Sequence, residues 1–184
     1  MSFITIKKIS VKEVPQIITL LNTTLSFGLA NYNNVSQYIQ STYAYCALDN
    51  NKVVGIITSK ELMDPASEFL QHENVLQKLN ECQINHAIIV KQLAVAQYYR
   101  GQGIGTNLLD QLLKQHAGRN FVTVGWITPS GWNAKSIFHK NSFQPLIYVK
   151  EFWLKDSLLK KYDCPYCKKF GPGCSCSAVI CIKD

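Results

Sequence analysis

The segment from Tyr99 to Thr106 constrains the fold of this chain more than any other, because it reads Tyr-Arg-Gly-Gln-Gly-Ile-Gly-Thr. It follows an apolar run over residues 87–95 and precedes residues 104–113, where Ile and Leu recur at helical spacing. Glycine has no Cβ atom, so the backbone turns tightly and its N–H groups can approach an anion. The N-terminus of the following helix supplies further unpaired N–H donors. This order predicts a strand, a phosphate-binding turn and a helix.

The spacing of the glycines distinguishes this turn from other phosphate-binding loops. A Walker loop has a lysine after its last glycine, whereas Thr106 follows Gly105. A dinucleotide-binding loop has two residues between its last two glycines, whereas one residue separates Gly103 from Gly105. The remaining pattern is Arg-x-x-Gly-x-Gly, which begins at Arg100 and follows Leu93-Ala94-Val95.

The chain has 184 residues, the length of one domain. Strand patterns cover residues 3–6, 44–48, 53–58, 87–95, 121–127 and 143–153, and helical patterns cover 11–25, 35–43, 61–81, 104–113 and 133–140. The polar residues 49–52 predict a hairpin, and residues 178–182 are a candidate for one more strand. We therefore expect a mixed α/β domain over residues 1–155 with a helical insertion at 61–85, followed by a Cys-rich tail at 156–184.

In the order and spacing of residues 87–117, the sequence resembles the GNAT superfamily of acetyl-CoA-dependent N-acetyltransferases, and the resemblance extends over residues 3–155. It implies a central, mostly antiparallel sheet flanked by helices. It also implies direct attack of an amine, from a small molecule or a peptide, on acetyl-CoA in a ternary complex. The cofactor-binding residues that it implies are Leu93, Ala94, Val95, Arg100, Gly101, Gln102, Gly103, Ile104, Gly105, Thr106, Asn133 and Phe138.

The catalytic residues are not evident from the sequence. Relatives often carry an acidic or histidine base on the strand before the glycine loop, where Ile89 and Lys91 occupy the positions expected to face the cleft. Phe138 replaces a tyrosine that usually protonates the departing thiolate. The substitutes that the sequence offers are Glu61, His86 and Glu151 as bases, and Tyr148, Ser130 and Ser136 as hydroxyl donors. A covalent acetyl-cysteine route would require Cys46 or Cys82 in the cleft.

Five of the seven cysteines lie in the last 21 residues. Cys164 and Cys167 form a Cys-x2-Cys pair, and Cys174 and Cys176 follow after a Gly-Pro-Gly link. Four thiolates at such spacings predict a structural zinc ion, and free thiols or two disulfides are the alternatives. The similar ending of some bacterial GNAT-like proteins favours zinc. Cys181 lies in an apolar run and is predicted to be a core residue.

The net charge of +7 is uneven, since residues 86–150 carry seven basic side chains and one acidic one. This concentration favours an anionic ligand such as the phosphates of CoA.

No apolar run approaches the length of a membrane helix, no signal-peptide pattern opens the chain, and the clustered cysteines favour a reducing cytoplasm. Two other functions remain open. They are a CoA-binding regulatory domain without turnover and, ranked below it, binding of nucleic acid or protein by the basic tail.

Overall fold

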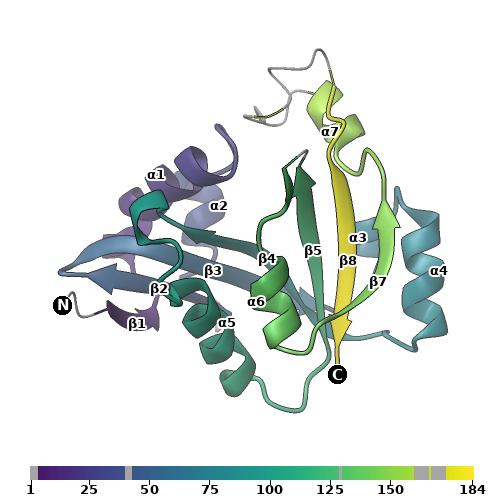
Figure 1. The fold of residues 1–184 in the computed structure, drawn as a ribbon, viewed down its shortest axis with the longest axis horizontal. Helices are drawn as coiled ribbons and strands as arrows, with labels where there is room; N and C mark the ends of the chain where they lie inside the picture. The colour runs from purple at the N-terminus through teal and green to yellow at the C-terminus, as the bar shows by residue number, and fades with distance from the viewer. Residues whose placement is uncertain (1–3, 40–42, 129, 160–165, 167–172) are drawn as a thin grey trace.

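The computed structural model describes all residues except 1–3, 40–42, 129, 160–165 and 167–172 (Figure 1). Its strands are β1 (Ile4–Lys8), β2 (Ala44–Asp49), β3 (Lys52–Leu62), β4 (Ala87–Val95), β5 (Phe121–Thr128), β6 (Gly131–Trp132), β7 (Gln144–Val149) and β8 (Ser177–Lys183). Its α-helices are α1 (Val14–Thr24), α2 (Tyr32–Ser36), α3 (Ala66–Phe69), α4 (Glu73–Glu81), α5 (Ile104–Gln115), α6 (Lys135–Lys140) and α7 (Leu154–Leu158), and the short 3-10 turns are η1 (Val11–Glu13) and η2 (Gln97–Tyr99).

The strands form one sheet in the order β1-β2-β3-β4-β5-β8-β7, with β6 paired to β5. Neighbouring strands are antiparallel except β4 and β5, which run parallel. The expected mixed α/β fold with a mostly antiparallel sheet is therefore confirmed. Residues 178–182 do join the sheet, because β8 pairs with β5 along Ser177–Lys183 and with β7 on its other edge. The last strand of the chain, β8, therefore lies inside the sheet, between β5 and β7.

Helices cover both faces of the sheet. Alternate residues of β2 divide between the faces, since Tyr45 and Ala47 pack toward α5 whereas Ala44 and Cys46 pack toward α1 and α2. At the other end of the sheet, the helices α3 and α4 cover the face that includes Ile180 of β8 (Figure 1). No helix among the described residues is long and apolar enough to cross a membrane.

Local sequence explains where the first helix begins. The backbone N–H and the hydroxyl of Ser10 both donate to the Glu13 carboxylate, at 2.9 and 2.7 Å, which closes a capping box before α1. Pro15 lies at the start of the helix, where its missing N–H leaves no hydrogen bond unmade. The buried face of α1 then includes Ile17 and Leu21.

Two predicted helices differ from the structure. Where a helix was predicted at 35–43, the structure has α2, which ends at Ser36. This helix begins earlier than predicted because Asn31 caps it by accepting from the Asn34 N–H at 3.0 Å. The continuous helix predicted over 61–81 is instead the end of β3 followed by the separate helices α3 and α4. Pro65 marks the break, since it precedes α3 and cannot donate a backbone hydrogen bond.

Candidate active site

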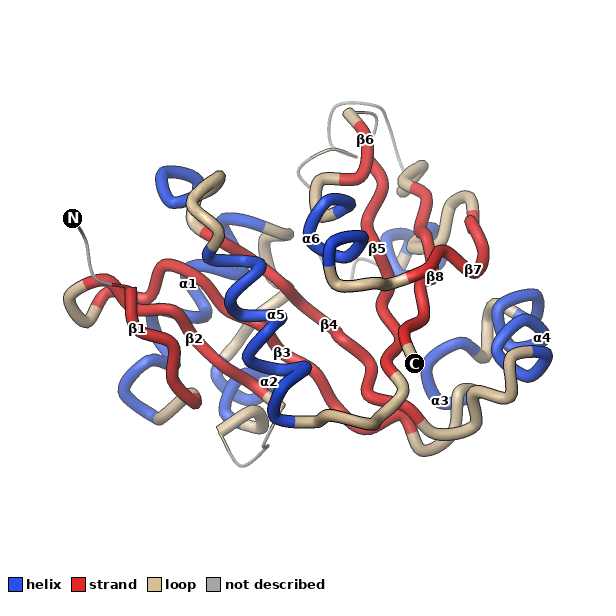
Figure 2. Tube along the Cα trace, turned by 60° about the horizontal axis from the view of Figure 1, so that its bottom comes forward, coloured by secondary structure: helices blue, strands red, loops and turns tan. Residues whose placement is uncertain are grey.

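The parallel strands β4 and β5 separate after a short paired stretch, and a cavity opens between them. They pair only where Ile88–Val90 lies beside Phe121–Thr123, and their carboxyl ends then diverge (Figure 2). A cavity of about 900 Å³ lies at this divergence. The end of β4 and the start of α5 line one part of it, and β5, β6 and α6 line another. Beyond Val90, no strand among the described residues pairs with the edge of β4 that faces the gap.

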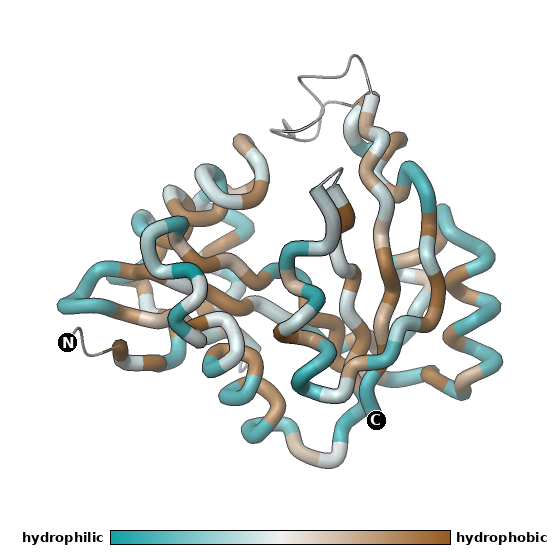
Figure 3. Tube along the Cα trace, viewed as in Figure 1, coloured by the Kyte–Doolittle hydropathy of each residue, from teal (hydrophilic) through white to brown (hydrophobic). Residues whose placement is uncertain are grey.

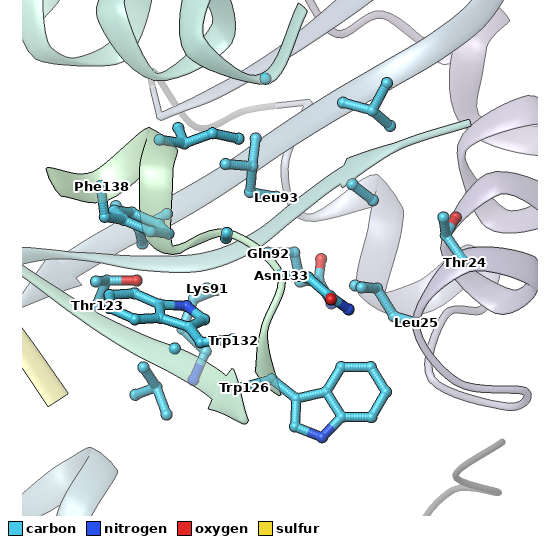
Figure 4. A pocket seen from close by; sticks show the side chains of 18 of the residues that line it. Thr24, Leu25, Lys91, Gln92, Leu93, Thr123, Trp126, Trp132, Asn133 and Phe138 are labelled. Carbon is cyan, nitrogen blue, oxygen red and sulfur yellow. The ribbon is translucent and has the colours of Figure 1, made fainter. Parts of the chain in front are cut away.

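A β-bulge lies at the point where β4 leaves β5. Thr58 of β3 pairs with Gln92 while Ser59 pairs with Val90, so Lys91 is the extra residue of the bulge. The hydroxyl of Thr58 donates to Oε1 of Gln92 at 3.0 Å and fixes that amide at the cavity wall. The bulge therefore directs both Lys91 and Gln92 to the cavity (Figure 4).

The glycine loop lies at the same cavity. Gly101 and Gly103 have φ angles of 77° and 80°, in the left-handed region that favours glycine, and Gly103 is the N-cap of α5. Gly105 lies close to α6, since a Cβ atom on it would be 2.8 Å from Cδ1 of Ile137. The loop thus presents the unpaired N–H groups at the start of α5, which favour a negatively charged ligand.

Side chains next to the loop fix its position. Nε of Arg100 donates to the carbonyl of Val95 at 3.1 Å, and the Tyr99 hydroxyl donates to Oδ2 of Asp49 at 2.8 Å. The hydrogen bond to the Asp49 carboxylate raises the pKa of Tyr99 above its ordinary value. The loop is thereby tied to both the end of β4 and the β2–β3 hairpin.

The structure brings most of the predicted cofactor residues to the cavity. Its lining includes Leu93, Ala94, Val95, Arg100, Gly101, Gly103, Ile104, Gly105, Thr106, Asn133 and Phe138. Gln102 is outside the lining, and its amide donates to the carbonyl of Tyr98 at 3.2 Å. Phe138 is only 3% exposed and packs edge-on against Phe143, with ring centroids 5.1 Å apart. Its main role is therefore in the core beneath the cavity.

The structure places Ile89 and the three candidate bases away from the cavity lining. Ile89 was expected to face the cleft, but it is fully buried in the core under α3 and α4. Glu61 accepts hydrogen bonds from Tyr43 at 2.6 Å and Arg119 at 3.1 Å, which lower its pKa, and it does not line the cavity. His86 and Glu151 are exposed and lie outside the cavity lining as well.

One of the predicted hydroxyl donors, Ser136 of α6, lines the cavity. Tyr148 is 62% exposed on β7, and Ser130 is hydrogen-bonded to Thr128 at 2.8 Å; neither residue lines the cavity. Cys46 is buried under α1, Cys82 is exposed at the end of α4, and both are outside the cavity lining. The structure thus gives no support to a covalent cysteine route through either of them.

Glu68 of α3 is a cavity residue that the sequence did not single out. Its carboxylate forms ion pairs with both Lys60 of β3 and Lys91 of the bulge, and its side chain is 13% exposed. Burial opposes ionisation, but the hydrogen bonds from the two lysines outweigh it, and the pKa of Glu68 lies below its ordinary value. The ion pairs hold the insertion against β4. The contact between Glu68 and Lys91 depends on the β-bulge at Lys91. The sequence did not predict it, because a bulge has no distinct sequence signal.

Other wall residues missed from the sequence come from four separate elements and are mostly apolar. They include Leu25, Ser26 and Leu29 after α1, Phe69 of α3, Trp126 of β5, and Phe152 and Trp153 before α7. Gly125 is the one local signal, since a glycine within a strand often marks a close approach of another group. Here the indole of Trp132 lies against it.

Two of the predicted zinc ligands are described. Cys174 and Cys176 are 2% and 3% exposed and lie in one cluster with Trp126, Trp153 and Tyr166. The other two, Cys164 and Cys167, lie outside the described residues. Within the part of the chain that is described, no group of three or more His, Cys, Asp or Glu side chains is placed to hold a metal ion.

The basic side chains of residues 86–150 do not all lie at the cavity, although their concentration in the sequence favoured an anionic ligand such as CoA. Among these seven basic side chains, Lys91, Arg100 and Lys140 line the cavity. Arg119 instead pairs with Glu61, and Lys91 pairs with Glu68. Arg100 and Lys140 are therefore the cavity cations best placed to attract phosphate groups.

Known structures share this architecture. NAA60 from Arabidopsis thaliana, in complex with a bisubstrate analogue, matches with a TM-score of 0.70 at 14% identity, covering 98% of this chain and 97% of that one. The mosquito arylalkylamine N-acetyltransferase-like protein 5b matches with a TM-score of 0.67 at 16% identity, covering 98% and 99%. An N-acetyltransferase from Staphylococcus aureus Mu50 matches with a TM-score of 0.64 at 12% identity, covering 100% and 99%. At these identities the likeness establishes the fold.

The sequence establishes the family. The profile of the acetyltransferase (GNAT) family matches residues 17–139, which include the bulged strand, the glycine loop and α5. The chain therefore belongs to the GNAT acetyltransferase family. No curated protein sequence matches the chain significantly.

Proposed function

We propose that this protein is an N-acetyltransferase that moves an acetyl group from acetyl-CoA to an amine by direct attack. The observation that carries the proposal is the position of the glycine loop, which places the free N–H groups of α5 on a cavity between two diverging strands. A ligand with phosphate groups and an extended arm fits these two features. Support also comes from NAA60, a protein of this fold whose structure has been determined with acetyl-CoA.

In the proposed complex, the loop from Arg100 to Thr106 binds the pyrophosphate through backbone N–H groups. The backbone of Leu93–Val95, which lines the cavity, binds the amide groups of the pantetheine arm. Asn133 and Ser136, at the start of α6, line the cavity opposite this strand. Apart from Gln102, the residues given these roles line the cavity, which supports the assignment.

The reaction joins the amine nitrogen to the thioester carbonyl carbon and breaks the carbon–sulfur bond. The amine must lose a proton before it attacks, since alkyl ammonium groups have pKa values near 10. That first proton passes to solvent. The sulfur leaves as a thiolate and takes up a proton, and the second proton lost by the nitrogen restores the group that delivers it, so the products are the neutral amide and the CoA thiol. Ser136 is the hydroxyl of the predicted set that lines the cavity, and we assign it the role of donating to the departing sulfur.

Titration calorimetry with acetyl-CoA and release of free thiol from acetyl-CoA in the presence of amines test this function. We expect binding in the micromolar range, and thiol release that depends on the amine. The variant Ser136→Ala should lower kcat about 10-fold or more without changing acetyl-CoA affinity, as expected for loss of a proton donor. Absence of binding at millimolar acetyl-CoA would refute the proposal.

A CoA-binding domain without turnover is the second candidate. The observation that favours it is the set of side chains around the β4 bulge. Ile89 points into the core, and Lys91 is held by Glu68. Neither supplies a base at the place where relatives often have one. Binding of acetyl-CoA without amine-dependent thiol release over a broad panel of amines would select this function.

We also propose that the Cys-rich segment binds a structural zinc ion. Cys174 and Cys176 are buried in one cluster, so two thiolates could reach a single ion there. Tyr166, which lies between Cys164 and Cys167 in the sequence, contacts the same cluster through Trp126, with ring centroids 5.3 Å apart. Four sulfur ligands match the preference of zinc for a closed tetrahedral site, whose role is to stabilise the fold.

A further inference from the structure

We propose that the acceptor is a small aromatic monoamine, bound at the end of the cavity away from the glycine loop. This inference rests on the proposed acetyl transfer and names its substrate class. The wall at this end combines Leu25 and Leu29 from the segment after α1 with Trp126 from β5. Leu25 and Trp126 approach the cavity from opposite sides, and the indole of Trp126 extends across the open space (Figure 4).

Further aromatic rings extend this wall. Phe69, Phe152 and Trp153 also line the cavity. Phe69 is 1% exposed and supports the wall from the core, whereas Phe152 and Trp153 are partly exposed; Phe152 stacks on His72 with ring centroids 4.0 Å apart. Aromatic side chains that are fixed in this way offer flat apolar surfaces and edge contacts to another ring. They also attract a cationic amine when it lies over a ring face.

The charges at this end do not match a polycation. Glu68 and Asp156 are the carboxylates of the lining, and Glu68 already forms ion pairs with Lys60 and Lys91. Asp156 acts electrostatically on His72, whose pKa is lowered chiefly by burial. A polyamine or an aminoglycoside would bring several positive charges, whereas one of the two lining carboxylates, Glu68, is already neutralised by its two lysines. A single amino group on an apolar body therefore fits this end best.

The size of the cavity indicates a small acceptor. The space of about 900 Å³ extends from the glycine loop to the aromatic wall, so the acyl donor and the acceptor must share it. Small-molecule sites typically have volumes of about 300–1,000 Å³ for one ligand. One or two rings with a short side chain therefore fit beside the pantetheine arm, whereas a longer acceptor would extend out of the cavity, which is open to solvent.

The test compares kcat/KM for tryptamine, 2-phenylethylamine, ethylamine, spermidine, kanamycin and a short peptide with an N-terminal methionine. We expect the two aromatic amines to exceed ethylamine, spermidine and kanamycin by about 10-fold or more, as contacts with several rings would give. Preference for spermidine, kanamycin or the peptide overturns the inference while acetyl transfer stands. Acetyl-CoA binding without turnover of either aromatic amine also overturns it. Failure to bind acetyl-CoA removes the proposed function itself.

Substitutions of Trp126 and Leu25 test whether these side chains cause the preference for aromatic amines. Trp126→Ala should lower kcat/KM for tryptamine about 10-fold, change that for ethylamine less than about 3-fold, and leave acetyl-CoA affinity unchanged. Trp126→Phe should retain most of the preference. Leu25→Ala tests the opposite wall without disturbing the sheet. Tyr148→Ala is the matched control, since this exposed aromatic residue lies on β7 outside the cavity lining. Equal losses for tryptamine and ethylamine in Trp126→Ala and Leu25→Ala would contradict the assignment.

Discussion

The indole of Trp132 lies directly against Gly125, so that a Cβ atom on Gly125 would be 2.7 Å from Nε1 of Trp132. On its other side, the same Cβ atom would be 2.7 Å from Cγ1 of Val179 on β8. Nε1 of Trp132 is buried and has no hydrogen-bond partner among the described residues. The absence of a side chain at Gly125 therefore allows β6 to place an aromatic ring along the cavity wall.

Replacing Gly125 by alanine should destabilise the protein. Neither Trp132 nor Val179 can move without disturbing the sheet, so we expect a loss of about 1–3 kcal/mol in the free energy of unfolding. Denaturant titration measures this loss. The comparison variant Trp132→Phe should cost less, because it removes a buried donor that has no partner. A Gly125→Ala protein as stable as the wild type would contradict the close packing.

Gly103→Ala should weaken acetyl-CoA binding as well as stability. Gly103 has a φ of 80°, and a side chain in this left-handed conformation costs about 1–2 kcal/mol. Gly118 offers a matched control, since its φ is 77°, no atom lies within 4 Å of its absent Cβ, and it lies outside the cavity lining. We expect similar losses of stability in both alanine variants, but a weaker acetyl-CoA affinity by calorimetry only in Gly103→Ala.

Glu68→Gln should destabilise the protein in a pH-dependent way. The pKa of Glu68 in the folded state lies below its model-compound value of 4.5, so its ion pairs contribute stability above that pH. This stability is lost as the pH falls through the lower folded-state pKa. We expect a cost of about 1–3 kcal/mol at pH 7 that shrinks below pH 4.5, measured by urea unfolding across this range. A cost that does not change with pH would show that the charge of Glu68 is not involved.

Glu61→Gln should leave acetyl transfer unchanged. Glu61 is bound by Tyr43 and Arg119 away from the cavity, so it cannot accept a proton from the amine there. Its carboxylate is partly exposed, and we expect a change in stability of about 0–1 kcal/mol. Steady-state kinetics with a saturating amine compare the two proteins. A large fall in kcat at unchanged stability would restore Glu61 as a candidate base.

The purified full chain should contain one zinc ion. Zinc bound by Cys164, Cys167, Cys174 and Cys176 stabilises the folded state, so a strong chelator should lower the melting temperature. Elemental analysis and thermal unfolding measure these effects. Cys176→Ser should abolish zinc binding, whereas Cys181→Ala should retain it, since Cys181 is buried among the core residues of β8. Full zinc content in Cys176→Ser would contradict the proposed ligand set.

The sequence predicted the elements whose signals are local. The apolar periodicity of residues 104–113 identified α5, and the glycines at its start, Gly101, Gly103 and Gly105, identified the loop that lies on the cavity. These signals survive in the structure because backbone conformation and helix burial depend on near neighbours. The same reasoning failed at residues 61–81, where Glu61 and Leu62 continue β3. Tertiary pairing with β4 decided that boundary.

The tertiary structure alone decided which side chains share the cavity. Glu68 reaches Lys91 only because β4 has a bulge at that residue, and the bulge depends on the register between two strands. Leu25 and Trp126 are about one hundred residues apart in the sequence, and they face one cavity because β4 and β5 diverge. The sequence by itself therefore determined the family and the glycine loop. The aromatic wall of the cavity depends on contacts between distant segments, which no local pattern encodes.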